Sequence, residues 1–401
     1  MTQAPKDSEH TAPHLGLMAL AIGVSVANPY YAQSLLPQVE QTFALPGGMV
    51  LLGPMITQLG IALGYLLLVP LGDSRERRRL LCLLAVAMAM ACLGTLLAGN
   101  FAALLAAWFA LGLVALIPAL LPTALTALTP ESRRGRMLGI VLSGQFSGIL
   151  LSRSVSGLVA QFWGWRSIYA ISAGAMLAVA LLFWRRLPTL PATDRRSYWQ
   201  LQASQLDLWR RYSRLRRSCL SQALLFGTFM ALWSAVALYL AGPPWHLGPG
   251  WIGSFALVGL VSIVAAPLIG RWVDRNGPDR IVLAGLCCCG LGVMLLGLVP
   301  GSLVALVVGL MAVDLGVQGT FVANQARIYA LNPEARSRMS GQLFLTAYLG
   351  AAGCSIAIAA LWGIWGWSGT CALAFALVGL GLAVERGSWR TGAAGDAAPL
   401  P

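Results

Sequence analysis

Residues 130–139 read PESRRGRMLG, and residues 333–341 read PEARSRMSG, which is nearly the same motif 203 positions later. Two further matches keep almost the same interval. The tripeptide WGW at residues 163–165 returns after 202 positions at residues 365–367, and Asp73 returns after 201 positions as Asp274. The chain has 401 residues, so the interval is about half of its length. Three matches at one interval predict two homologous halves.

The composition places both halves in a membrane. Apolar residues make up 58% of the chain and charged residues only 10%, whereas soluble domains carry about 25% charged residues. The 27 Lys and Arg and the 14 Asp and Glu residues suffice for the rims of a bundle in lipid but could not cover a globule. This excludes a soluble enzyme. The net charge of +13 then indicates membrane topology rather than a nucleic-acid partner.

Twelve stretches are long and apolar enough to span a bilayer, which takes about 20 residues. We expect spanning helices at 15–36, 49–71, 80–98, 101–128, 137–160, 164–184, 219–241, 250–270, 281–299, 302–327, 340–361 and 366–385. Each half holds six of them, an even number, so both halves face the same way. The predicted fold is an all-α integral membrane protein with two pseudo-symmetric six-helix bundles.

The positive charges predict the orientation. Every second connection is basic, and 25 of the 27 Lys and Arg residues fall on one side, with Arg153 and Arg166 as the exceptions. The positive-inside rule then places both termini in the cytoplasm. A composition rich in Arg, Ala, Leu and Gly favours a bacterial source, and therefore a location in the inner membrane. We divide the chain into a tail (1–14), a first bundle (15–187), a linker (188–218), a second bundle (219–386) and a tail (387–401).

The linker between the halves is basic and contains spaced Trp, Tyr and Leu residues. This pattern favours an amphipathic helix on the membrane surface, and a solvated linker is the alternative. The eight cysteines show no spacing typical of a metal site. A phosphate-binding P-loop needs a lysine after its glycines, and the only lysine, Lys6, is not in such a motif. We therefore expect no cofactor, no metal and no enzymatic activity.

Two parallel halves, a long basic linker and an Asp-plus-Arg loop after the second and eighth spans resemble the major facilitator superfamily of secondary transporters. The superfamily's signature, Gly-x-Leu-Ala-Asp-Arg-x-Gly-Arg-Arg, is matched by GRWVDRNG at residues 270–277. The first half departs from it, with Val69 and Glu76 in place of the two glycines. The resemblance covers residues 15 to about 390. It implies a conformational latch formed by Asp73, Arg77, Arg78, Asp274 and Arg275; charge that only sets the topology is the alternative.

Other departures bear on the mechanism that the resemblance implies. Many proton-coupled members have an arginine four residues before a glycine in the fourth span, where this chain has Trp108 before Gly112. The antiporter motif of the fifth span is replaced by SRSVSG at residues 152–157. The pattern as a whole, including NPYY at residues 28–31, is similar to an uncharacterised bacterial branch near the drug-efflux members.

Two charged residues lie deep within predicted spans. Arg153 is about sixteen residues into the fifth span and Asp314 about twelve into the tenth, which are depths of ~24 and ~18 Å. A charge at such depth costs roughly 2.5–3.5 kcal/mol and needs a partner or a water-filled cavity. A direct or water-bridged pair between the two is geometrically possible. We expect Asp314 to bind a coupling proton and Arg153 to be its counter-charge or an anion site; a structural ion pair is the alternative.

Polar residues on one face of the tenth span, together with the spans that line the cavity in the superfamily, predict a substrate cavity. Interhelical hydrogen bonds are the alternative for each of them. The expected cavity residues are Asn28, Tyr31, Gln33, Gln222, Trp233, Gln318, Asn324 and Gln325. Gly60 and Gly64, like Gly144 and Gly148, form Gly-x-x-x-Gly motifs that allow close helix crossings, which we expect near the interface of the halves.

We therefore predict a monomeric secondary transporter that moves a small organic solute by alternating access, with proton-coupled efflux as the favoured mode. A facilitator of a small metabolite is the alternative within that class. A non-transporting sensor or lipid-handling protein of the same shape is the alternative from another class. The expected partners are the solute, protons and the lipid bilayer.

Overall fold

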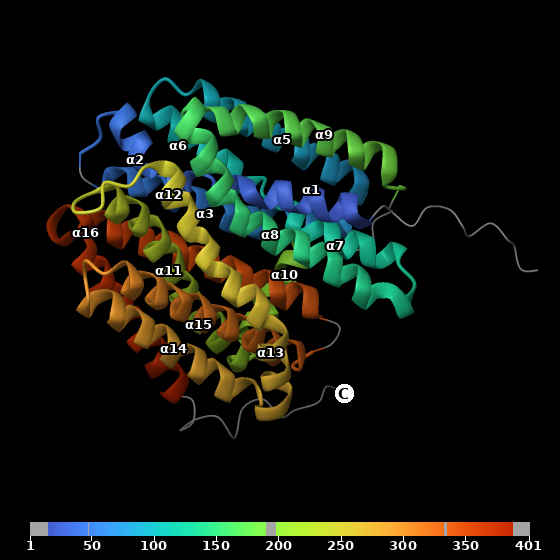
Figure 1. Cartoon of the computed structure of the whole chain (residues 1–401). Coiled ribbons are helices and arrows are strands. Elements are labelled where there is room, and N and C mark those ends of the chain that lie inside the picture. The colour runs from blue at the N-terminus through green and yellow to red at the C-terminus, as the bar shows by residue number, and fades with distance from the viewer. Residues whose placement is uncertain (1–14, 47, 190–197, 333–334, 388–401) are drawn as a thin grey trace, which may run out of the picture.

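The computed structural model describes residues 15–46, 48–189, 198–332 and 335–387. The predicted N-terminal tail (1–14), the predicted C-terminal tail (387–401) beyond its first residue, and residues 190–197 of the predicted linker lie outside these residues. The first half contains α1 (Leu15–Ala27), η1 (Asn28–Tyr30), α2 (Ala32–Thr42), η2 (Met49–Leu51), α3 (Leu52–Leu67), α4 (Leu71–Ser74), α5 (Arg77–Leu97), α6 (Phe101–Leu113), α7 (Ile117–Leu128), α8 (Glu131–Trp163) and α9 (Ser167–Arg186). In Figure 1 these blue to green helices lie in the upper part of the molecule.

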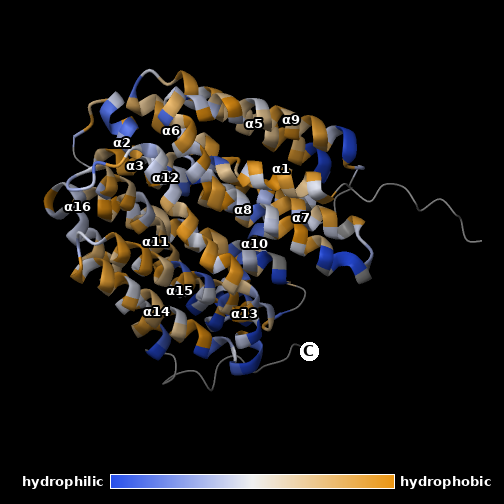
Figure 2. Cartoon of the chain, in the orientation of Figure 1, coloured by the Kyte–Doolittle hydropathy of each residue, from blue (hydrophilic) through white to orange (hydrophobic). Residues whose placement is uncertain are grey.

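The linker helix α10 (Tyr198–Arg211) precedes the second half. That half, yellow to red in Figure 1, contains α11 (Ser213–Ala241), α12 (Pro249–Ser254), η3 (Phe255–Gly259), α13 (Leu260–Asn276), α14 (Pro278–Leu298), α15 (Leu303–Tyr329) and α16 (Arg336–Gly387). Hydrophobic residues cover most of the helix lengths, and hydrophilic residues gather at helix ends such as those of α9 and α13 (Figure 2). The chain is thus a multi-pass membrane protein.

The helices agree with the twelve expected spans. Eleven helical stretches of the described chain are long and apolar enough to cross a membrane, and the last of them, Arg338–Arg386, has 49 residues. One crossing needs only about 20 residues. The backbone of α16 leaves the helical conformation at Gly366, with φ 51° and ψ −132°, so this stretch forms two spans. The bend falls in the second copy of the WGW motif.

The two signature loops make their turns in different ways. In the second half, Gly277 adopts a left-handed φ of 80° between α13 and α14, a conformation that favours glycine. At the matching position of the first half, Glu76 has an extended backbone, and its carboxylate accepts hydrogen bonds from the backbone N–H groups of Arg78 and Arg79, both at 2.9 Å. The departure from the superfamily motif is therefore a helix cap for α5.

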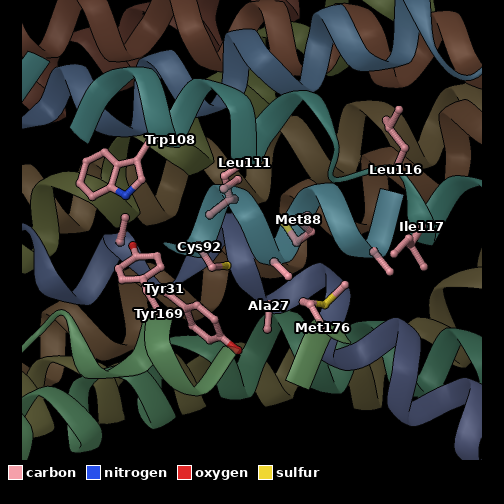
Figure 3. Packing of buried hydrophobic residues seen from close by; sticks show 14 of the residues in the cluster. Ala27, Tyr31, Met88, Cys92, Trp108, Leu111, Leu116, Ile117, Tyr169 and Met176 are labelled. Atoms are coloured by element: carbon pink, nitrogen blue, oxygen red, sulfur yellow. The ribbon is translucent and has the colours of Figure 1, made fainter. Parts of the chain in front are cut away.

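The apolar core falls mainly into one cluster for each half, and the cluster of the first half also includes Ala231, Leu238, Cys354 and Ile358 from the second half. In the first half Trp108, Tyr169 and Met88 are almost completely buried, and Figure 3 shows how they pack around α5 and α6. A second core joins α11, α14, α15 and α16. The halves contact each other through α8 with α12 and η3, and through α3 with α16. Two cores joined along these contacts are what a pair of homologous bundles requires.

The Gly-x-x-x-Gly motifs allow close crossings, but within the first half. A Cβ atom added at Gly144 or Gly148 would clash with backbone atoms of α1, and one added at Gly60 or Gly64 would clash with backbone atoms of α6 or the turn that follows it. The expectation that these glycines serve the interface of the halves is thus wrong. At that interface the close approaches use Gly253, which faces the backbone of α8.

The described part of the linker bonds to both halves. In α10, Tyr198 and Gln202 donate to the Leu67 and Leu66 carbonyls of α3, at 3.1 and 2.6 Å. From the second half, Gln342 of α16 donates to the Gln205 carbonyl of α10. In α10 itself, Trp199 and Leu206 are exposed, by 78% and 50%, and exposed apolar side chains are what a helix on the membrane surface requires.

Candidate functional site

Arg153 of α8 lies at the junction of the two halves and is only 4% exposed. Its Nε donates a 2.5 Å hydrogen bond to Oε1 of Gln33 on α2. Its guanidinium lies over the Trp233 ring of α11, with 4.5 Å between Cζ and the ring centroid. The rings of Tyr30 and Phe229 lie 5.7 and 5.9 Å away. An amide and an aromatic cage from both halves therefore stabilise this buried cation.

Asp314 of α15 contacts the N–H edge of Trp233. It is 6% exposed, and its Oδ1 accepts a 3.0 Å hydrogen bond from Trp233 Nε1. Its Oδ2 faces η3, where a Cβ added at Gly259 would lie 2.9 Å away. The absent side chain at this glycine leaves room for the carboxylate between α15 and the eighth span. One carboxylate oxygen thus accepts the indole N–H, and the other lies against η3.

The expected partnership of Arg153 and Asp314 takes an indirect form. In the described part of the chain no direct ion pair joins them, and the Trp233 indole contacts both, Arg153 through its ring face and Asp314 through its N–H. The ring face attracts the guanidinium, and the ring N–H donates to the carboxylate. One side chain therefore offsets part of the cost of burying both charges.

A small cavity of about 10 Å³ adjoins this group, which is room for about one water molecule. It is lined from both halves, by Gln33, Ser34, Arg153, Trp233, Val236, Ala237 and Ile252. The Nη2 atom of Arg153 is buried without a hydrogen-bond partner in the protein. An organic solute enters such a site only when the halves separate, which agrees with alternating access.

Two expected cavity residues lie inside the first half instead. Asn28 Oδ1 accepts hydrogen bonds from Ser172 Oγ at 2.6 Å and Cys92 Sγ at 3.1 Å. Tyr31 packs edge-on against Tyr169, with ring centroids 6.3 Å apart (Figure 3). The physical reason is helix rotation. Positions 28 and 33 are five residues apart, about 140° around a helix, so Gln33 faces the junction when Asn28 faces the core.

Gln222 and Asn324 are in contact with each other but belong to a different cluster. Asn324 Nδ2 donates to Gln222 Oε1 at 3.3 Å, and Asn324 Oδ1 accepts from Arg327 at 3.2 Å. Asn324 lies ten residues beyond Asp314 along α15, about 15 Å away. Gln318 and Gln325 are half-buried on the same helix. Of the eight expected cavity residues, the structure brings Gln33 and Trp233 together with the buried charges.

A buried ion cluster adjoins Asn324 and was not predicted from the sequence. Arg327 and Glu385 form a bidentate pair with both distances at 3.2 Å, and they are 4% and 1% exposed. Asp279 contacts Arg327 at 2.6 Å and Arg217 at 2.8 Å, and Arg217 contacts Glu385 at 3.2 Å. Arg327 and Glu385 lie at the ends of predicted spans, where charged residues are usually exposed at the membrane surface. No signal in the sequence indicated their burial.

The predicted latch residues lie near the ends of the helices. Arg77 is buried and its Nε donates to the Gly72 carbonyl at 2.9 Å, while Arg78 lies 4.6 Å from the centroid of the Trp184 ring. Asp274 and Arg275 are exposed. The side chain of Asp73 lies outside the described residues. This conformation therefore shows the latch residues of the second half facing away from the protein.

Two bundles with buried charges at their junction define a membrane transport protein. The chain belongs to the Major Facilitator Superfamily, which it matches over residues 15–251. It is 34% identical over 356 residues to an uncharacterised transporter of Escherichia coli, YgaY, covering 88% of this chain and 90% of that protein. It is 32% identical to a probable transporter of Streptomyces coelicolor, over 92% and 85% of the two chains.

More distant relatives and solved structures agree with this assignment. A probable sugar efflux transporter of Pasteurella multocida is 24% identical over 79% of this chain and 77% of its own length. The POT family transporter PepTSo has a similar fold, with a TM-score of 0.75 at 11% identity over 95% of this chain and 99% of that one. The nucleoside transporter NupG gives a TM-score of 0.72 at 13% identity, over 94% and 100% of the two chains. The chain is a transport protein rather than an enzyme.

Proposed function

We propose that the protein is a proton-coupled secondary transporter that exports a small organic solute across the bacterial inner membrane. The halves rock about the site at Trp233, opening it to one side and then to the other. The basic loops face the cytoplasm, and both termini lie there. Sugar efflux is named for the distant relative from Pasteurella multocida and for two from Helicobacter pylori, and this supports the direction of transport but does not identify the solute.

The position of Asp314 carries the proposal. This carboxylate is buried at the junction of the halves, and its hydrogen-bond donor, Trp233, also holds the cation of the other half. A proton that binds to Asp314 removes the charge that attracts the indole N–H. It therefore changes how tightly the two halves hold each other, which is the link that coupling requires. Gln318 and Gln325 complete the solute path along α15.

In the opposite conformation, the signature loops form the latch. We propose that Asp73, Arg77 and Arg78 in the first half, and Asp274 and Arg275 in the second, then make charge-assisted hydrogen bonds that close the cytoplasmic side. The outward position of Asp274 and Arg275 in this structure agrees with an open latch.

A two-stage experiment tests the proposal. Solutes that raise the unfolding temperature of the purified chain at an acidic and an alkaline pH are first identified, and their flux is then followed in liposomes with an imposed pH gradient. Asp314→Asn keeps the shape but cannot exchange a proton, so flux driven by the gradient should vanish while solute binding persists. Full gradient-driven flux in Asp314→Asn would refute the coupling role. Solute flux in the wild type that does not depend on the pH gradient would identify a facilitator.

A further inference from the structure

We infer that the solute is an organic anion, and that Arg153 binds its acidic group. The inference rests on the proposed function, because it names the chemical class of solute for the same central site. It is carried by the buried, unused donor of Arg153 and by the residues that surround it.

Arg153 has hydrogen-bonding capacity that the protein does not use. Its Nε donates to Gln33, but its Nη2 is buried without a partner, in a side chain that is 4% exposed and lines the cavity. A buried donor of a charged group is costly to leave unpaired. The planar guanidinium fork matches the two oxygens of a carboxylate, and such bonds are among the strongest in proteins. An anionic oxygen in the cavity satisfies this donor.

The charges around the cavity favour an anion over a cation. Among the residues that line it in the described structure, Arg153 alone is charged. Asp314 does not line the cavity and forms no direct ion pair with Arg153 in the described structure, and one of its carboxylate oxygens accepts the Trp233 indole N–H. A cationic solute would meet a buried positive charge at short range, and burial makes that repulsion strong.

The rest of the wall indicates the body of the solute. Val236, Ala237 and Ile252 line the side of the cavity that belongs to the second half, and the Trp233 ring completes it. Such a surface fits an alkyl or aromatic group, while Ser34 and Gln33 supply hydrogen bonds near the acidic end. The site thus fits an amphipathic monoanion, such as an aromatic or medium-chain carboxylate.

The test compares acids with matched neutral and cationic compounds on the full-length purified chain. Benzoate, phenylacetate and octanoate are each measured beside the corresponding amide and amine, by the shift in unfolding temperature and by quenching of tryptophan fluorescence. We expect one or more of the carboxylates to bind, and the matched amides and amines to bind at least about tenfold more weakly. Binding of the amides or amines as tight as that of the acids, or no binding of any carboxylate, overturns the inference.

Three variants locate the binding. Arg153→Gln should weaken carboxylate binding about tenfold or more, because the charge and the fork are lost. Gln33→Glu places a carboxylate where Gln33 now accepts from Arg153, so it should block binding without unfolding the chain. Arg166→Gln removes an arginine that lies outside the junction. It is the matched control, and its carboxylate binding should equal that of the wild type. Unchanged carboxylate binding in Gln33→Glu refutes the inference even where Arg153→Gln does not fold.

The outcomes separate this inference from the proposed function. Carboxylate binding that depends on Arg153, without any flux in liposomes, supports the anion site and contradicts transport. Gradient-driven flux of a neutral or cationic solute supports proton-coupled transport and refutes the anion site.

Discussion

Trp233 is the residue on which the site depends. Its ring face contacts the Arg153 guanidinium from the first half, and its N–H donates to Asp314 in the second. At the 202-residue interval of the repeat, the matching residues are Tyr31 for Trp233 and Ser355 for Arg153. Tyr31 packs inside the first half against Tyr169. The duplicated fold therefore carries a single copy of this arrangement, so the two halves have different roles in the site.

A substitution at Trp233 separates its two contacts. Trp233→Phe keeps an aromatic ring beneath Arg153 but removes the hydrogen bond to Asp314, so the buried carboxylate loses a donor. We expect a loss of about 1.5–3 kcal/mol in the free energy of unfolding. Denaturation of the purified protein in mixed micelles measures it. Trp163→Phe, at a residue that is 70% exposed, is the control. Equal stability of the two variants would contradict the proposed role of the N–H group.

At the scale of single helices, α15 and α16 form the ion cluster of Arg327 and Glu385. The 202-residue interval of the repeat assigns Leu125 and Phe183 to the same positions in the first half, and both are completely buried. One half thus fills this place with apolar side chains and the other with a bidentate ion pair. Buried pairs of this kind add little net stability over an apolar pair, but removing one partner leaves an unpaired buried charge.

The chain itself therefore suggests a rescue experiment. Glu385→Gln should lower the free energy of unfolding by about 3–5 kcal/mol, because Arg327 then lacks its bidentate partner. The double variant Arg327→Leu, Glu385→Phe copies the first half and should recover most of that loss, since Arg217 and Asp279 can still pair with each other. Unfolding in mixed micelles compares the two. A double variant less stable than Glu385→Gln would show that the pair itself, and not its charge balance, stabilises the helices.

The same helices show how far the sequence predicts the structure. Span positions depend on local apolar length, so even the two spans merged in α16 were predicted, and the repeat gave the two bundles. The positions of Arg153 and Asp314 well inside predicted spans indicated that both need partners, and both are buried. The rotation of each helix about its own axis depends on the neighbouring helices, so it could not be predicted from the sequence. Gln33 faces the junction and Asn28 does not, although one polar pattern included both, and Glu385 appeared to be a rim residue.

The whole molecule is held together at the junction of α8 with the eighth span. The close approaches there are those of Gly157 to Pro249, Gly250 to Gln161, and Gly253 to the backbone of Arg153. All three lie in the half of α8 that is remote from its start at Glu131, where the basic loop is located. The glycines let the backbones touch on that side, and Gly253 does so at Arg153 itself, next to the charged group.

Widening this contact should shift the balance between the two conformations. Gly253→Val places a branched side chain against the Arg153 carbonyl, where even a Cβ would clash, so α12 must move away from α8. We expect faster amide hydrogen exchange in residues 249–259 and a solute site that opens more readily to that side. Gly174→Val, at a glycine with no atom within 4 Å of an added Cβ, is the matched control. In Gly174→Val, the amide hydrogen exchange rates of α12 and η3 should equal those of the wild type. If Gly253→Val also leaves this exchange unchanged, the close approach does not hold the halves together, and other contacts between the halves, such as those of α2 with α11, keep that side closed.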